Sequence, residues 1–392
     1  MSGSDTIQNL LHGLPELRER VRCIKEIFLT NAVMVGEIPA PTFQEEKRIR
    51  FLCDRFTESG LLDISRDEMG NATAVLPGTE GQRNILVAAN ANSVFYDGVD
   101  HTVSVGVDTI TGVGLSDNAL GCATLVTLPV LLERLGLRFR SNLVLTAPTR
   151  TLGTADMSGF NFFLDNVKAD IDAAICLRGS ELGRISYSSL GTLRGRISVR
   201  FAEGQGWHRQ SLPGAIVELE AILHQILSIP VPSTPRTTIL LGSVNAGATF
   251  NTAPSRATLQ FEIRSEDAAW VRRIERQIDM IVEEVGAGTS AKIVFDKIGR
   301  GEPGSLHYSD PLVQVAHDVV KTLDLPLRVR PSAGLLSRLI PRGIPALTIG
   351  LTEREDSLEV SEEMRIEPIF AGLAQLVTVL SAIDEGVCHE QD

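Results

Sequence analysis

Apolar residues in the first half of the chain recur with two different spacings. In segments 14–35, 45–59 and 119–135 they stand three or four positions apart, which is typical of helices with a buried face. Short aliphatic runs predict strands at 72–76, 84–89, 142–147 and 173–177. Because strands alternate with helices, this half predicts an α/β domain with a mostly parallel sheet.

The pattern changes near Leu193, where apolar and polar residues begin to alternate as in half-buried strands. The following segments have the order strand, helix, strand, strand, helix, strand, which is the order of a ferredoxin-like sandwich. Helix and strand signals of the first type return after about residue 301. The sequence therefore predicts an α/β domain interrupted by an α+β domain, with segments 1–190, 191–300 and 301–392.

Composition narrows the class of protein and its partners. Hydrophobic residues at 43% and charged residues at 22% are ordinary for a globular protein and exclude a disordered or fibrous chain. The net charge of −12 repels phosphate backbones and anionic lipid, so we expect neither nucleic acid nor membrane as a partner. The five cysteines are scattered without paired spacing, and no leader segment precedes the first helix, which favours the cytoplasm.

Six segments of the chain share an order and spacing that point to one family. They are IPAPTFQEE at 38–46, DEMGNATAVLPG at 67–78, ILVAANANSV at 85–94, GVGLSDNALG at 112–121, AGATFNTAPSRATLQFEIR at 246–264 and GIPALTIG at 343–350. Together they resemble the di-zinc aminoacylase and carboxypeptidase family, which includes peptidase T, acetylornithine deacetylase and succinyl-diaminopimelate desuccinylase. The resemblance implies a zinc-peptidase-like α/β domain interrupted by a lid domain that pairs two chains, and therefore a homodimer.

The same resemblance implies five protein ligands around two zinc ions and a general-base glutamate. The metal-binding positions fall on Asn90, Asp117, Thr151, Arg178 and Leu358, or on Asp356 if the last loop is shifted. The position that orients the first ligand falls on Asn92, and the general base falls on Arg150. Only Asp117 retains a side chain that zinc prefers.

The substituted residues argue against the family's chemistry. Asn90 supplies no imidazole, and Asn92 supplies no charged partner to orient one. Arg150 replaces the base with a permanent cation, and a second cation, Arg178, would repel zinc. We therefore expect no cofactor, with zinc only if these positions are misassigned. Asp117 is either a remaining ligand or the N-cap of the helix that follows, with Asn118 as the other candidate cap, and capping is the favoured interpretation.

Two residues of the inserted domain have matching roles in the family. His208 resembles the lid histidine that reaches the partner's site, and it is equally well explained as a surface histidine. Asn251 resembles a substrate-contacting asparagine, although a turn before Pro254 explains it slightly better. The basic strand 194–200 is expected to be the solvated face of an edge strand. His101 lies in a polar loop for which a metal site is disfavoured.

The favoured hypothesis is a protein that keeps a metallohydrolase fold, has lost zinc-dependent hydrolysis and serves as a binding or assembly module. The alternatives are a hydrolase that works through changed ligands or without metal, and a di-zinc peptidase or amidohydrolase whose site is misaligned. If the alignment holds, Arg150 and Arg178 emerge at the ends of core strands, where α/β sheets bind ligands. One could pair with Asp117 and the other bind a small anion, or both could simply reach solvent.

Overall fold

The computed structural model describes residues 3–96, 98–202, 214–250, 253–355 and 361–388. The chain forms two compact units, one made of residues 1–188 with 305–392 and the other of residues 189–304. The inserted unit thus begins and ends within a few residues of the segment 191–300 in which strand alternation dominates the sequence.

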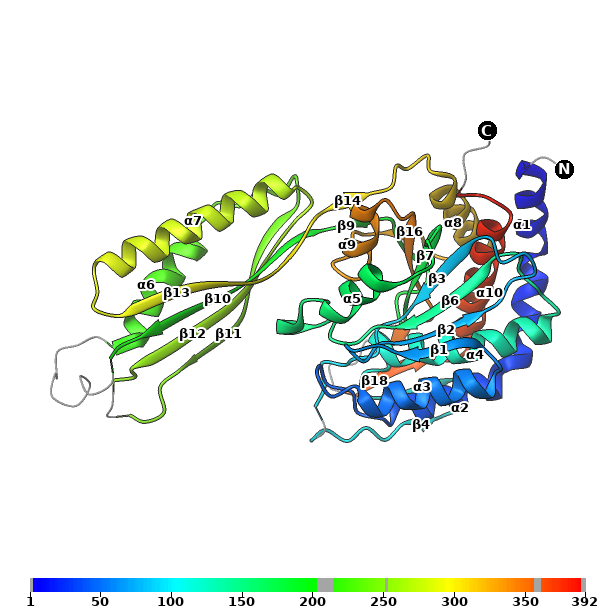
Figure 1. The fold of residues 1–392 in the computed structure, drawn as a ribbon, viewed down its shortest axis with the longest axis horizontal. Helices are drawn as coiled ribbons and strands as arrows, with labels where there is room; N and C mark the ends of the chain where they lie inside the picture. The colour runs from blue at the N-terminus through cyan, green and yellow to red at the C-terminus, as the bar shows by residue number, and fades with distance from the viewer. Residues whose placement is uncertain (1–2, 97, 203–213, 251–252, 356–360, 389–392) are drawn as a thin grey trace. The chain divides into compact units, whose positions relative to one another are not determined.

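The first unit is built on one eight-stranded sheet with the order β1-β2-β6-β3-β7-β16-β8-β15 (Figure 1). The four central strands β6, β3, β7 and β16 run parallel, and β1 and β2 are antiparallel to their neighbours. β8 pairs antiparallel with β16 and parallel with β15. The strand bounds are Leu62–Arg66 (β1), Ala72–Leu76 (β2), Asn84–Ala88 (β3), Asn142–Ala147 (β6), Ala173–Arg178 (β7), Arg184–Ser186 (β8), Arg328–Val329 (β15) and Ala346–Gly350 (β16). The predicted α/β class with a mostly parallel sheet is confirmed.

Helices cover both faces of this sheet. Alternate side chains of β3 point to opposite faces of the sheet. Ile85 and Val87 pack into the hydrophobic core on one face, and Leu86 and Ala88 pack into the core on the other. The larger core involves α1 (Gly3–Arg20), α2 (Lys25–Gly36), α3 (Glu46–Glu58), α4 (Leu120–Leu135), α8 (Pro311–Thr322) and α10 (Glu367–Asp384). The smaller core involves α5 (Ser158–Asn166) and α9 (Leu336–Leu339). The predicted helix 14–35 is divided by a 3₁₀ turn, Val21–Ile24.

A small second sheet, β17-β18-β5-β4, lies in the same unit and was not expected from the sequence. Its bounds are Arg354–Glu355 (β17), Glu362–Arg365 (β18), Thr109–Gly112 (β5) and Ser104–Val105 (β4). Its central pair joins β18 to β5, which are about 250 residues apart in the chain, so local patterning carries no signal for it.

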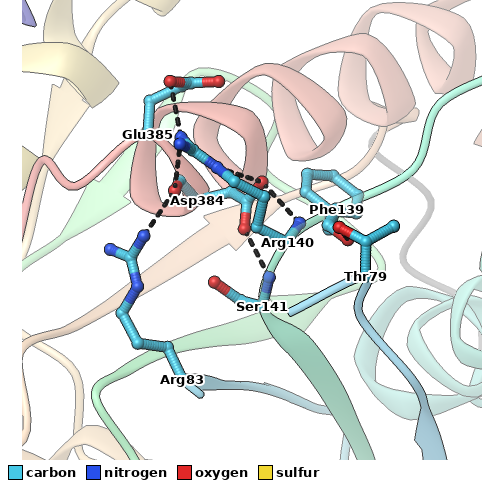
Figure 2. Close-up of polar contacts among 7 residues, drawn as sticks. All are labelled: Thr79, Arg83, Phe139, Arg140, Ser141, Asp384 and Glu385. Carbon is cyan, nitrogen blue, oxygen red and sulfur yellow. Dashed lines mark hydrogen bonds and ion pairs between the residues drawn. The ribbon is translucent and has the colours of Figure 1, made fainter. Parts of the chain in front are cut away.

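The last helix is fixed to the start of β6 by its C-terminal residues (Figure 2). The Asp384 carboxylate accepts hydrogen bonds from the backbone N–H groups of Arg140 (2.9 Å) and Ser141 (2.7 Å). Arg83 donates to the Asp384 carbonyl at 2.9 Å, and Arg140 also reaches Glu385 at 2.6 Å. By length and composition α10 could cross a membrane, but 83% of it is buried, as in the core helix of a globular unit.

The second unit is a four-stranded antiparallel sheet with the order β11-β12-β10-β13 and two helices packed on one face (Figure 1). The element bounds are Gly191–Arg200 (β10), Gly214–Leu227 (α6), Thr237–Ala246 (β11), Arg256–Ser265 (β12), Ala268–Ala287 (α7) and Lys292–Gly301 (β13). The expected strand and helix order is therefore confirmed. The short pair β9 (Ser188–Ser189) and β14 (Gly304–Ser305) forms its own two-stranded sheet.

The expectation that strand 194–200 lies at a sheet edge is wrong. β10 pairs with β12 on one side and with β13 on the other, so it is central. Its arginines are accommodated by acidic residues on the neighbouring strands, with Arg194 2.6 Å from Glu262 and Arg196 3.2 Å from Asp296. The arginines of this central strand are thus paired across the sheet, with the Arg196 side chain still 40% exposed.

Candidate functional site

The parallel core of the first unit brings the substituted positions to one edge of the sheet. Because β3, β6 and β7 run in the same direction, their carboxyl ends lie together. Asn90 and Asn92 follow β3, Arg150 and Thr151 follow β6, and Arg178 is the last residue of β7. This edge is the candidate functional site.

Asn92 is the centre of a neutral hydrogen-bond network at this edge. Its amide nitrogen donates to Thr42 Oγ1 at 2.9 Å, and its Oδ1 accepts from Thr151 Oγ1 at 2.5 Å. Asn118 donates to the Asn92 backbone carbonyl. Asn92 and Thr151 are fully buried, so both residues are held as uncharged partners of one another.

Asn90 lies beside two buried groups that fix the same loop. The Cys122 thiol donates to the Asn90 carbonyl at 3.2 Å, and burial raises the pKa of Cys122 to about 11, so it remains a thiol at neutral pH. Arg48, only 2% exposed, donates to the carbonyls of Ala91 (3.0 Å) and Ile38 (2.6 Å). The Asn90 Oδ1 atom is buried without a hydrogen-bond partner among the described residues.

Arg150 is held in an unusual backbone conformation. Its φ of +53° lies in the left-handed region, which residues other than glycine adopt at a cost of about 1–3 kcal/mol. The carboxylate of buried Glu45 accepts the Arg150 N–H at 2.8 Å and stabilises this turn. The guanidinium lies 3.4 Å from Met69 Sδ and 5.9 Å from the centre of the Phe43 ring. The position expected for a general base therefore carries a cation packed on an aromatic ring.

The Asp-x-x-Gly-Asn segment fixes the strand end that carries Arg150. The Asp67 carboxylate accepts from the N–H groups of Met69 (3.0 Å) and Asn71 (2.9 Å). Asn71 Oδ1 in turn accepts from the Thr149 N–H at 2.8 Å. The motif therefore has a structural role, because it fixes the backbone at Thr149, the residue before Arg150.

Asp117 does not occupy the cap position that was expected of it or of Asn118. A π-helical turn, Leu115–Ala119 (η2), precedes α4, so the helical conformation begins before both residues. The turn is tied to β18, because Glu362 accepts from the Ser116 N–H (2.7 Å) and Ser116 Oγ (2.5 Å). The Asp117 side chain lies outside the described part of the structure, so its pairing with an arginine stays a prediction.

Arg178 lines a cavity of about 610 Å³ at the end of β7. Its Nε lies 3.6 Å from the carboxylate of Glu181, in the loop between β7 and β8. Arg150 is not among the residues that line this cavity in the described structure. Among the described residues, Arg178 therefore lies in a cavity where a ligand could reach several cations at once.

These side chains do not fit a pair of zinc ions. Zinc prefers imidazole, thiolate and carboxylate donors, whereas the inherited positions whose side chains the structure describes at this edge carry two amides, a hydroxyl and two guanidiniums. The amide and hydroxyl of Asn92 and Thr151 are also engaged with one another. No group of three or more His, Cys, Asp or Glu side chains that could hold a metal occurs within the described residues.

Several predicted positions cannot be placed. His208, Asn251, Leu358 and Asp356 lie outside the described residues. His101 is described and buried, with its Nε2 3.3 Å from the Tyr96 carbonyl. That contact is an ordinary one for a histidine in a loop.

Sequence reasoning missed the residues that surround the substituted positions. These residues lie in or just after the IPAPTFQEE segment and are Thr42, Glu45 and Arg48. The available signal was the acidic Glu45 and the basic Arg48, which stand close together at the start of a predicted helix. Glu362 gave no signal, since it meets Ser116 across 246 residues of chain.

Comparisons with known proteins address the fold. Residues 189–290 match the M20-type peptidase dimerisation domain. The whole chain is similar to the di-peptidase Dug1p of Saccharomyces cerevisiae, with a TM-score of 0.78 and 12% identity over 96% of this chain and 99% of that one. It is also similar to aminopeptidase PepT from Bacillus cereus, with a TM-score of 0.68 and 16% identity over 92% and 98% of the two chains.

A further similar structure is the YXEP protein of Bacillus subtilis, a dinuclear metal-binding peptidase from the M20 family. Its TM-score is 0.62, with 13% identity over 92% of this chain and 98% of that one. No curated protein matches the sequence at a significant level.

Proposed function

Because the chain has the fold of the M20 peptidases and contains their dimerisation domain, we propose that it is a homodimeric binding protein in which a neutral hydrogen-bond network replaces the dinuclear metal site. The observation that carries this proposal is the 2.5 Å hydrogen bond between Thr151 and Asn92. The resemblance assigns a zinc ligand and its orienting partner to these positions, and here each is uncharged and satisfied by the other.

A second observation points the same way. Hydrolysis by this family needs a carboxylate base, whereas Arg150 places a guanidinium, which offers no acceptor, at that position. Its left-handed backbone is fixed by Glu45, so the substitution is built into the surrounding structure. The five cysteines are all free, which fits the proposed cytoplasmic location.

The proposal predicts no metal-dependent hydrolysis. Purified protein is incubated with N-acyl amino acids, dipeptides and tripeptides, with added zinc and separately with a chelator. A metal-dependent dipeptidase serves as the positive control. We expect product formation no faster than in the enzyme-free blank under both conditions. Turnover that the chelator abolishes would show a working metal site, and turnover that survives the chelator would show a metal-free hydrolase; either result contradicts the proposal.

The homodimer has a physical basis in the edges of the inserted sheet. β13, one edge strand, carries four charged residues, whereas β11, the other, carries none over its ten residues. An uncharged edge of this length is open to pairing with another strand. Leu240 and Val244 on β11 are more than half exposed, and Ile216 of α6 is 48% exposed nearby. We therefore propose that β11 and α6 form the dimer interface.

Charges placed on this edge should separate the subunits. We expect light scattering of the wild type at micromolar concentration to give twice the 42.5 kDa chain mass. The double variant Leu240→Lys/Val244→Lys should give the single-chain mass, because symmetric pairing would bring like charges together. Met280→Lys on α7, a residue 59% exposed, is the matched control and should remain dimeric. A monomeric wild type, or a dimeric double variant, would contradict this interface.

A further inference from the structure

A cavity of about 620 Å³ lies among the helices α2, α3 and α4 and the end of β2. Leu76, the last residue of β2, is paired with Leu143 near the start of β6. The cavity is therefore at the amino edge of the parallel strands, whereas the candidate functional site is at their carboxyl edge. We call it the amino-edge cavity.

Asn31 is the buried polar group of the amino-edge cavity. It lines the cavity and is only 1% exposed. Its amide nitrogen donates to Thr127 Oγ1 at 2.9 Å, but its Oδ1 has no hydrogen-bond partner among the described residues. A buried acceptor without a donor is unfavourable, so this atom favours a bound molecule that donates a hydrogen bond.

Two helices add acceptors around the same cavity. α3 ends at Glu58, and the next two residues, Ser59 and Gly60, line the cavity, so the carbonyl end of the helix dipole lies there. α4 contributes Pro129, which has no N–H to donate to the Leu125 carbonyl one turn earlier. Both features favour a ligand that carries positive charge or donates hydrogen bonds.

Glu133 supplies a counter-ion for such a ligand. It lines the cavity from α4 and is exposed, and its carboxylate forms no hydrogen bond or ion pair within the described structure. The cation that lines the cavity, Arg55, is bonded to the Glu58 carboxylate one turn further along α3. The guanidinium is thus already paired, while the Glu133 carboxylate is available to a ligand.

The remaining walls of the amino-edge cavity are apolar. A second cavity, of about 480 Å³, adjoins it, since Leu76, Pro129 and Glu133 line both. Apolar walls beside a few polar groups are typical of sites for small organic molecules, whose carbon chains they remove from water. The apolar residues of the amino-edge cavity are Ile27, Leu76, Val126, Pro129 and Val130.

We propose that the amino-edge cavity binds a primary ammonium group attached to a short apolar chain. The ammonium donates to Asn31 Oδ1 and has the Glu133 carboxylate as its counter-ion, and the chain packs on the apolar walls. A free alkylamine and a lysine side chain of a partner share this chemistry. The inference does not depend on the proposed function, because the cavity contains no residue of the candidate functional site.

The test is calorimetric titration of the full-length protein with propylamine, hexylamine and N-acetyl-lysine N-methylamide, and with hexanoate and hexyltrimethylammonium for comparison. Hexylamine should bind more tightly than propylamine, because its longer chain buries more apolar surface. Hexyltrimethylammonium has the same charge but no N–H donor, and should bind at least tenfold more weakly than hexylamine. Tighter binding of the lysine derivative than of hexylamine would assign the site to a lysine side chain, and the reverse to a free amine.

Three variants locate the binding. Val130→Phe fills the cavity and should abolish hexylamine binding. Asn31→Leu removes the acceptor at similar volume and should weaken binding about tenfold or more. Glu133→Gln should weaken it about fivefold and reduce its dependence on salt. Glu26→Gln is the matched control, since Glu26 is an exposed carboxylate on α2 outside the cavity, and its affinity should equal that of wild type.

Absence of saturable hexylamine binding would overturn the inference. Wild-type affinity in Glu133→Gln and Val130→Phe would overturn it too, and these two variants, at exposed and partly exposed residues, remain decisive if Asn31→Leu fails to fold. Tighter binding of hexanoate than of hexylamine would overturn the assigned ligand class. Equal affinities for hexylamine and hexyltrimethylammonium would overturn the role given to Asn31.

Discussion

Replacing Arg48 by alanine is expected to lower the free energy of unfolding of the first unit by about 3–5 kcal/mol. Arg48 is among the largest fully buried side chains, and its guanidinium joins the loop after β3 to the segment before α3 through the carbonyls of Ala91 and Ile38. The alanine variant would leave a cavity and two carbonyls without donors. Because Ala91 lies between Asn90 and Asn92, the network around Asn92 should loosen as well.

Arg50→Ala is the control for this prediction, two residues further along α3. Its side chain is 69% exposed and, among the described residues, pairs with exposed Glu46, so its loss should change stability by less than about 0.5 kcal/mol. Arg48→Met, which keeps most of the buried volume, should fall between the two. Urea denaturation followed by circular dichroism gives all three values. An Arg48→Ala variant as stable as Arg50→Ala would mean that the buried guanidinium does not hold this loop.

Replacing Gly179 by alanine is expected to destabilise the first unit by about 2–3 kcal/mol. The added Cβ would lie 2.6 Å from the Leu115 carbonyl oxygen and 2.8 Å from that of Ser116. Both contacts are with backbone, so either the π-helical turn or the β7–β8 loop must move. Movement of either displaces Arg178 and the lining of the cavity at the end of β7.

Gly13→Ala separates this steric effect from a general effect of removing glycine. Gly13 lies within α1 and a Cβ there meets no atom within 4 Å. Since alanine favours the helical conformation, this variant should be more stable than wild type by roughly 0.5–1 kcal/mol. Thermal unfolding of the two variants and the wild type measures both effects. A Gly179→Ala protein that keeps wild-type stability would contradict the close packing of Gly179 on the π-helical turn.

The sequence predicted the core strands well because burial on both faces leaves uninterrupted aliphatic runs. The runs 72–76 and 142–147 coincide with β2 and β6 to the residue. Six quoted segments likewise sufficed to predict the fold, which the structural comparisons confirm. The local pattern of residues could not predict the order of the strands within each sheet. The position of β10 between β12 and β13, and the sheet that joins β18 to β5, depend on pairings between distant parts of the chain.

At the site, the sequence located the substituted positions but not their partners. Asn92 and Thr151 were predicted separately, and only the structure brings them within 2.5 Å of one another. The expected capping role of Asp117 and Asn118 was wrong, because the π-helical turn places both residues within the helical conformation. The amino-acid composition of such a turn does not distinguish it from an ordinary helix start. Of the arginines that line the cavity at the end of β7, the sequence singled out Arg178 alone. The other arginines of this cavity come from β8, β15 and β17, which no motif links.

The central claim is that hydrogen bonding has replaced metal binding at the carboxyl edge of the sheet. Elemental analysis of untagged protein that has been exposed to excess zinc and then desalted tests this claim most directly. We predict no stoichiometric zinc, and the same trace content in wild type and in Asp117→Ala. One or two zinc ions per chain in the wild type, lost in Asp117→Ala, would contradict the claim and restore the dinuclear peptidase as the explanation of this fold.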